Sequence, residues 1–152
     1  MSLQLTTKEM SLLKDMKEQE ELCIRKYEDY ASRAKSEALK TLFTSMADTE
    51  REHLKTIQEM MGGNVTPVSG GISNANTPVG ETTYTNQEDK DSDRFLCQDM
   101  LMSEKHAASL YNTSVFEFTS PVARKVLAHI QAEEQQHGEQ LYTFMSTNGL
   151  YA

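Results

Sequence analysis

Two stretches of sixteen residues decide the fold: MADTEREHLKTIQEMM at 46–61 and IQAEEQQHGEQLYTFM at 130–145. Both space their apolar residues three and four apart, which is the period of a helix that buries one face. In each, a glutamate and a histidine three residues later interrupt the apolar stripe: Glu50 with His53, and Glu134 with His137. The two stretches align when the first is shifted by 84 residues. They therefore predict two equivalent helices, each turning a carboxylate and an imidazole inward.

The same shift relates the segments that precede these helices. Glu20 aligns with Glu104, Tyr27 aligns with Tyr111, and all four lie on or interrupt apolar stripes of helical period. We therefore predict an internal duplication, in which each half contributes one helix with a central glutamate and one with the Glu-x-x-His pair.

Glycine and proline mark where the helices are connected. Residues 62–87 hold five of the seven glycines and two of the three prolines. Such a long connection inside a compact domain usually has a task, here to carry the chain from one end of the molecule to the other. The sequence predicts one all-α domain, 1–152: a four-helix bundle made of the helix pairs 7–61 and 88–147, joined by the crossover linker 62–87.

Capping residues support these boundaries. The candidates are two capping boxes, Thr6 with Glu9 and Thr85 with Glu88; the helix starts Ser36 and Ser120; and the helix ends Gly62 and Gly149.

Composition excludes several classes of function. The 15 basic and 23 acidic residues give a net charge of −8, which argues against nucleic acid or an anionic membrane as partner. Two cysteines, Cys23 and Cys97, supply neither a disulfide framework nor a four-cysteine metal site. No run of 18 apolar residues exists, and the first ten residues are too polar for a signal peptide, so we expect a cytoplasmic protein.

The interior polar residues point to metal chemistry. Four carboxylates buried together without cations would suffer desolvation and mutual repulsion. Two divalent ions would cancel the charge of these carboxylates. The di-iron and di-manganese carboxylate proteins show the same pattern of ligands, with one Glu from each of two helices and a Glu-x-x-His pair from each of the other two. The predicted ligands are Glu20, Glu50, His53, Glu104, Glu134 and His137, with Glu50 and Glu134 as the expected bridges. Mixed oxygen and nitrogen ligands suit two iron ions, although manganese or zinc would also bind. A duplicated bundle that has lost its metal is the alternative.

Other polar residues have less specific interpretations. Tyr27 and Tyr111 are candidates for hydrogen bonds to the ligand carboxylates or for relaying electrons, and also for ordinary core tyrosines. We interpret Cys23 as an inert buried thiol near the site, and His106 and His129 as surface residues. The acidic residues Asp48, Glu52 and Glu133 have two interpretations: they belong to a solvated helix face, or they form a path by which metal ions enter the site.

The segments EELCIRKYEDYASRAK (20–35) and DTEREH (48–53) resemble the first helix pair of rubrerythrins, in the ferritin-like superfamily. This resemblance implies a ferritin-like bundle in which Glu20, Glu50 and His53 bind iron. Rubrerythrins carry a further carboxylate one turn after the residue matching Glu104, where this chain has Ala107, and they carry a rubredoxin domain that is missing here. The ligand set is therefore closer to that of bacterioferritin-type ferroxidase centres.

The segment 103–151 is similar to the Coat F family of spore coat proteins. The residues that carry this similarity are the Ser-Pro pair before a helix start rich in basic residues, and Met145, Gly149 and Tyr151 near the end of the segment. That resemblance implies a ferritin-like fold in which many members need no metal, and a place in the spore coat.

Two hypotheses follow. The first is a di-metal protein that reacts with O₂ or peroxide, an oxidoreductase of ferroxidase or peroxidase type. The second is a structural spore coat component, with coat proteins as partners, whose metal site is retained or vestigial. A homodimer is compatible with both.

Overall fold

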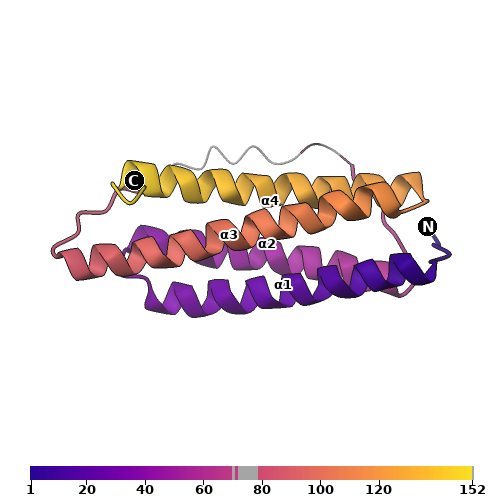
Figure 1. Ribbon diagram of the computed structural model, residues 1–152, viewed down its shortest axis with the longest axis horizontal. Coiled ribbons are helices and arrows are strands. Elements are labelled where there is room, and N and C mark those ends of the chain that lie inside the picture. Colours follow the sequence, from indigo (N-terminus) through magenta and orange to yellow (C-terminus); the bar gives the residue numbers. More distant parts are fainter. Residues whose placement is uncertain (70, 72–78, 152) are drawn as a thin grey trace.

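The computed structural model describes residues 1–69, 71 and 79–151. Its four helices are α1 (Thr7–Arg33), α2 (Glu37–Met61), α3 (Gln87–Glu117) and α4 (Pro121–Thr147), and they lie side by side as an elongated bundle (Figure 1). Within the described residues no strand forms, and an isolated bridge joins Ser2 to Asn64. The prediction of an all-helical four-helix bundle is confirmed.

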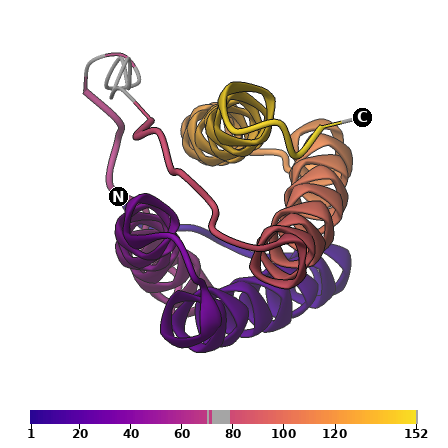
Figure 2. The same ribbon diagram turned by 90° about the vertical axis from the view of Figure 1, so that its left-hand side faces the viewer.

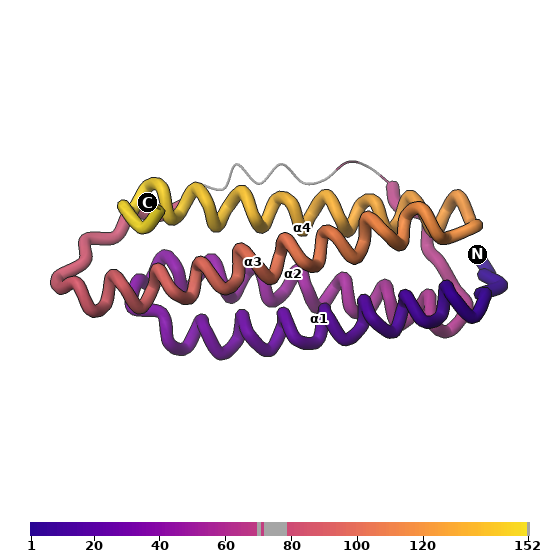
Figure 3. Tube along the Cα trace, in the orientation of Figure 1, coloured from indigo at the N-terminus to yellow at the C-terminus, as the bar shows by residue number. Residues whose placement is uncertain are grey.

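The helices form two hairpins, α1 with α2 and α3 with α4, and the hairpins meet mainly through α1 and α3 (Figure 2). The chain reverses direction at each short turn. Residues after α2 leave at the end that holds the N-terminus, whereas residues 79–86 approach α3 at the end that holds the C-terminus (Figure 3). The connection from α2 to α3 therefore does run from one end of the bundle to the other. Its central residues, 70 and 72–78, lie outside the described residues.

Most of the predicted caps are present. Thr6 and Glu9 form the capping box of α1, while Ser36 and Ser120 accept hydrogen bonds from the first turns of α2 and α4. Gly63 and Gly149, each just beyond a helix end, adopt positive φ values of 87° and 68° that favour glycine.

The predicted capping box of Thr85 and Glu88 is wrong. Asn86 caps α3 instead, because its side-chain oxygen accepts a hydrogen bond from Asp89 N at 2.8 Å. Asparagine caps a helix as well as threonine does, and the helix consequently begins at Gln87.

Two buried carboxylates fix the turns of one hairpin onto the other. Asp93 on α3 accepts hydrogen bonds from the backbone nitrogens of Lys35 and Ser36, in the α1–α2 turn, at 2.8 and 3.0 Å. Glu9 on α1 accepts one from the backbone nitrogen of Thr119, in the α3–α4 turn, at 2.9 Å. These bonds hold the two ends of the bundle and so set the register of the helices around its centre.

The apolar core divides into two clusters. One fills the end near the α1–α2 turn around Phe43 and Phe144, and the other fills the opposite end around Ile57 and Phe118. The polar residues of the candidate site come from the middle of the four helices. In the described part of the chain, no helix has the length and apolar character needed to cross a membrane.

Candidate metal centre

All six predicted ligand residues come together in the interior of the bundle. Glu20 lies on α1, Glu104 on α3, and each Glu-His pair on α2 or α4. All six are buried, with at most 5% of any of them exposed. A helix places residues three apart on one face, which is why each glutamate and its histidine point the same way.

The six residues form two overlapping groups of potential ligands. Glu20, Glu50, His53 and Glu134 offer one ligand atom each within 4.8 Å of one another, and so do Glu50, Glu104, Glu134 and His137. We name these the His53 half-site and the His137 half-site. Glu50 and Glu134 belong to both half-sites, which is the arrangement that carboxylates bridging two ions require.

The two histidines contact glutamates across the bundle in matching ways. His53 Nδ1 lies 2.8 Å from Glu134 Oε1, and His137 Nδ1 lies 2.9 Å from Glu50 Oε1. The two imidazole rings are 6.4 Å apart between centroids. Each histidine thus faces the glutamate of the other pair, across the interface of α2 and α4.

The tyrosine hydroxyls donate hydrogen bonds to the remaining two glutamates. Tyr27 on α1 donates to Glu104 Oε1 at 2.6 Å, and Tyr111 on α3 donates to Glu20 Oε1 at 2.7 Å. The predicted bonds to carboxylates are therefore present, and they run between α1 and α3. Each orients a carboxylate and leaves its second oxygen directed elsewhere. A role in electron transfer stays a prediction.

Several buried polar atoms in the centre have no hydrogen-bond partner among the described residues. They are Glu20 Oε2, Glu50 Oε1, Glu104 Oε2, Glu134 Oε2 and His137 Nδ1. The last of these is 2.9 Å from Glu50 Oε1, but the two atoms lack the orientation of a hydrogen bond. Buried polar atoms are normally satisfied, and four carboxylate oxygens and a ring nitrogen are a donor set that divalent cations would satisfy.

Burial and close contacts shift the pKa values of the glutamates in the centre. Burial raises the pKa of Glu20 to about 8, and the nearby Glu50 contributes to the rise. Burial also places the pKa of Glu134 well above its ordinary value, with further increases from the charges of Glu104 and Glu50. Burial alone would raise the pKa of Glu50 too, but the close approach of Glu20 and the two histidines outweighs burial and holds that pKa well below its ordinary value.

The pKa values of the two histidines are raised for a related reason. Burial acts to lower the pKa of His53, but hydrogen bonds to carboxylates, Glu133 foremost, outweigh burial and hold it well above its ordinary value. For His137 the nearby carboxylates of Glu104 and Glu50 outweigh burial and raise the pKa to about 9. Cations entering the centre would compete with protons for the same oxygen and nitrogen atoms.

Glu133, for which the sequence indicates a solvated face or a metal access path, contacts a histidine of the centre, and this contact was not predicted. Its Oε1 lies 3.1 Å from His53 Nε2 and 3.2 Å from Nε2 of His129, which is half-buried one turn earlier on α4. The signal available in the sequence was its position directly before Glu134. That signal is weak, because the residue before a ligand faces a different direction on an isolated helix.

The remaining residues considered from the sequence lie outside the six. Cys23 is buried, and Gln19 donates to its sulfur at 3.2 Å; burial raises the pKa of its thiol, which keeps it protonated and unreactive. Asp48 pairs with Arg51 on the surface, and Glu52 is exposed.

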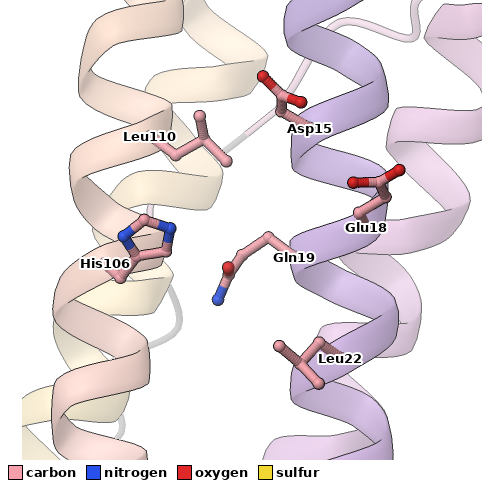
Figure 4. Close-up of a pocket in the computed structure, with 6 residues that line it drawn as sticks. All are labelled: Asp15, Glu18, Gln19, Leu22, His106 and Leu110. Atoms are coloured by element: carbon pink, nitrogen blue, oxygen red, sulfur yellow. The ribbon is translucent and has the colours of Figure 1, made fainter.

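His106 lines a shallow groove between α1 and α3 (Figure 4). Its other lining residues are Asp15, Glu18, Gln19, Leu22 and Leu110. Gln19 lies next to Glu20 in sequence, so this groove lies on the outside of α1 and α3 at about the level of the centre.

Comparison with known protein families finds a match in the second half of the chain. The family model of the Coat F domain matches residues 92–152, which include most of α3, all of α4 and the C-terminus. Searches of curated proteins and of solved structures return no match. The second half of the chain is therefore similar to Coat F domains, as its sequence suggested.

Proposed function

We propose that this protein is a ferritin-like di-metal protein, in which Glu20, Glu50, His53, Glu104, Glu134 and His137 hold two iron ions. The observation that carries the proposal is the set of buried, unpartnered ligand atoms from four helices that converge on one region. A hydrogen-bonded polar core without a metal would be expected to satisfy these atoms internally. Manganese or zinc would fit the same oxygen and nitrogen donors.

The proposal includes the internal duplication. The hydrogen bond of Tyr27 to Glu104 has a counterpart in that of Tyr111 to Glu20. Tyr111 lies 84 residues after Tyr27, and Glu20 lies 84 residues before Glu104, so the two bonds exchange the halves of the chain. The hydrogen bonds that Thr119 N donates to Glu9 and that Lys35 N donates to Asp93 are related by the same shift of 84. Reciprocal contacts of this kind are expected when two copies of a helix hairpin pack against each other around a pseudo-twofold axis.

Each residue has a defined task in this proposal. Glu50 and Glu134 would bridge the ions, since both half-sites contain them. His53 and His137 would each complete one half-site through Nδ1. Tyr27 and Tyr111 hold Glu104 and Glu20 in place and leave one oxygen of each free to bind.

We assign the reaction class on the same grounds. Bound Fe(II) would supply the electrons that reduce O₂ or peroxide and would itself become Fe(III). The burial of all six side chains restricts water around the reacting centre, which strengthens electrostatic interactions inside it. The protein would then act as an oxidoreductase of ferroxidase or peroxidase type.

Metal content tests the proposal. Purified protein incubated anaerobically with Fe(II) and then desalted is expected to retain two iron ions per chain, and admission of O₂ is expected to give ferric absorbance. The double variant Glu50→Ala, His137→Ala removes a ligand from both half-sites and is expected to lose stoichiometric iron. His106→Ala changes an exposed histidine outside the centre and serves as the control. Wild-type protein that retains no more iron than the double variant would refute the proposal.

A structural role in the spore coat is the second candidate, favoured by the Coat F match over residues 92–152. In that case surface residues would mediate assembly into the coat, and residues of the centre would bind metal independently of assembly. If the double variant assembles into spore coats as well as wild type does, coat assembly is independent of the metal. If coat fractions from spores lack the protein altogether, the coat role is wrong.

A further inference from the structure

The two half-sites match in the main distances between the atoms that face the centre, although only the contact of His53 with Glu134 has the geometry of a hydrogen bond. The distances from His53 Nδ1 to Glu134 and from His137 Nδ1 to Glu50 differ by only 0.1 Å, at 2.8 and 2.9 Å. The tyrosine bonds to the outer glutamates are similarly matched, at 2.6 and 2.7 Å. These distances therefore give little reason for one half-site to bind metal before the other.

A larger difference lies at the outer nitrogen of the two histidines, Nε2. His53 Nε2 lies 3.1 Å from Glu133 Oε1, and His129 Nε2 contacts the same oxygen at 3.2 Å. In the first half of the chain, the residues equivalent to Glu133 and His129 are Thr49 and Ser45, neither of which is acidic. The Thr49 hydroxyl donates to Ser45 O within its own helix at 3.3 Å. No carboxylate thus occupies the position that would serve His137.

We infer that Glu133 positions His53 and makes the His53 half-site bind metal first. The inference rests on the proposed function and assigns an order to the filling of the two half-sites. Glu133 would not touch the metal; it would act through the imidazole.

The physical reason is the arrangement of the imidazole ring. A carboxylate that accepts a hydrogen bond from Nε2–H fixes the proton on that nitrogen, so Nδ1 presents its lone pair to a metal. The same bond fixes the orientation of the ring and makes Nδ1 a stronger donor, and loss of such a partner typically costs 10–100-fold in metal affinity. Glu133 also adds a negative charge beside the His53 half-site and none beside the His137 half-site at a comparable position.

Zinc titration followed by ¹⁵N NMR of the histidine rings tests this order, because zinc is diamagnetic and stable in air. The chain has four histidines, at 53, 106, 129 and 137, so single His→Gln variants assign the signals. At one equivalent of Zn²⁺ the Nδ1 signal of His53 is expected to move, and the signal of His137 is expected to move only with the second equivalent. Calorimetry of the same titration is expected to show two steps.

Variants at Glu133 and at the equivalent Thr49 test whether the carboxylate of Glu133 sets the order of binding. Glu133→Ala is expected to weaken the first step 10–100-fold and to leave the second step within about twofold. Glu133→Gln keeps an oxygen acceptor without the charge and is expected to retain the proton position on His53, with an intermediate affinity. Thr49→Glu places a carboxylate at the position that matches Glu133 and is expected to strengthen the second step.

The outcomes distinguish the inference from the function on which it rests. If two zinc ions bind but His137 responds first, or both histidines respond together, the inference is wrong and the di-metal centre stands. The same holds if Glu133→Ala weakens both steps equally. If no zinc reaches the histidines of the centre, the proposed function fails and the inference falls with it.

Discussion

At the scale of single residues, the hydroxyl of Tyr27 is the donor that orients Glu104. Tyr27→Phe removes this donor and leaves a buried carboxylate oxygen without its partner. We expect the metal-free protein to lose about 1–3 kcal/mol in its free energy of unfolding, measured by urea denaturation. Tyr30→Phe is the control, because the Tyr30 hydroxyl bonds to the half-exposed Asp99. An effect of Tyr27→Phe no larger than that of Tyr30→Phe would contradict this role.

The raised pKa values of residues in the centre predict how the stability of the metal-free protein depends on pH. On folding, the pKa of Glu20 rises from 4.5 to about 8 and that of His137 rises from 6.5 to about 9. A group whose pKa is raised on folding stabilises the fold below its unfolded value, and this contribution is lost as the pH rises through the folded value. The Tm of EDTA-treated protein is therefore expected to fall between about pH 5 and pH 9.

The matching variant is Glu20→Gln, which cannot ionise. Its Tm is expected to depend less on pH between 5 and 8 than that of wild type, because one of the raised groups is gone. A wild-type Tm that stays level or rises over this range, measured by circular dichroism, would contradict the raised pKa values of these groups.

At the scale of elements, Asp93 fixes the α1–α2 turn to α3. It is fully buried and accepts hydrogen bonds from two backbone nitrogens and from the hydroxyl of Tyr84, at 2.8 Å. Asp93→Ala leaves these donors unpaired, and we expect a loss of about 3 kcal/mol in the free energy of unfolding. Asp91→Ala, on the exposed face of the same helix, should leave the urea midpoint nearly unchanged. Equal midpoints for the two variants would exclude the anchoring role.

The helices were predictable because local signals coincide with the final packing. Glu50 and His53 interrupt an apolar stripe, and a stripe of helical period specifies which side chains face inward whatever the neighbouring helices are. Thr6, Ser36 and Ser120 cap helices through contacts within four residues, which the sequence contains directly.

Contacts between distant elements could not be predicted in the same way. Glu133 reaches His53 only because α2 and α4 lie at a particular distance and rotation, and neither is encoded within one helix. Glu9 and Asp93 align at the shift of 84, which would have marked them as equivalent. Their partners in the opposite turns still depend on how the two hairpins pack. The cap at Asn86 was missed because Thr85 and Glu88 together match the sequence pattern of a capping box.

At the scale of the whole molecule, the fold brings one carboxylate or one Glu-His pair from each of four helices to a common region. The anchors at Glu9 and Asp93 lie toward opposite ends of the bundle and hold the two hairpins in register around this region. The net charge of −8 includes the four interior glutamates, so two divalent cations would neutralise as much negative charge as these carboxylates carry when ionised. The central claim is thus a property of the assembled bundle rather than of any one helix.

Anomalous diffraction tests this claim most directly. Crystals grown with Mn²⁺ or, without oxygen, with Fe²⁺ would be measured on both sides of the absorption edge of the metal. The account predicts two anomalous peaks about 3.5–4 Å apart, between Glu50 and Glu134 and enclosed by the other four ligands. Crystals grown at saturating metal that show no anomalous peak among these six residues would contradict it.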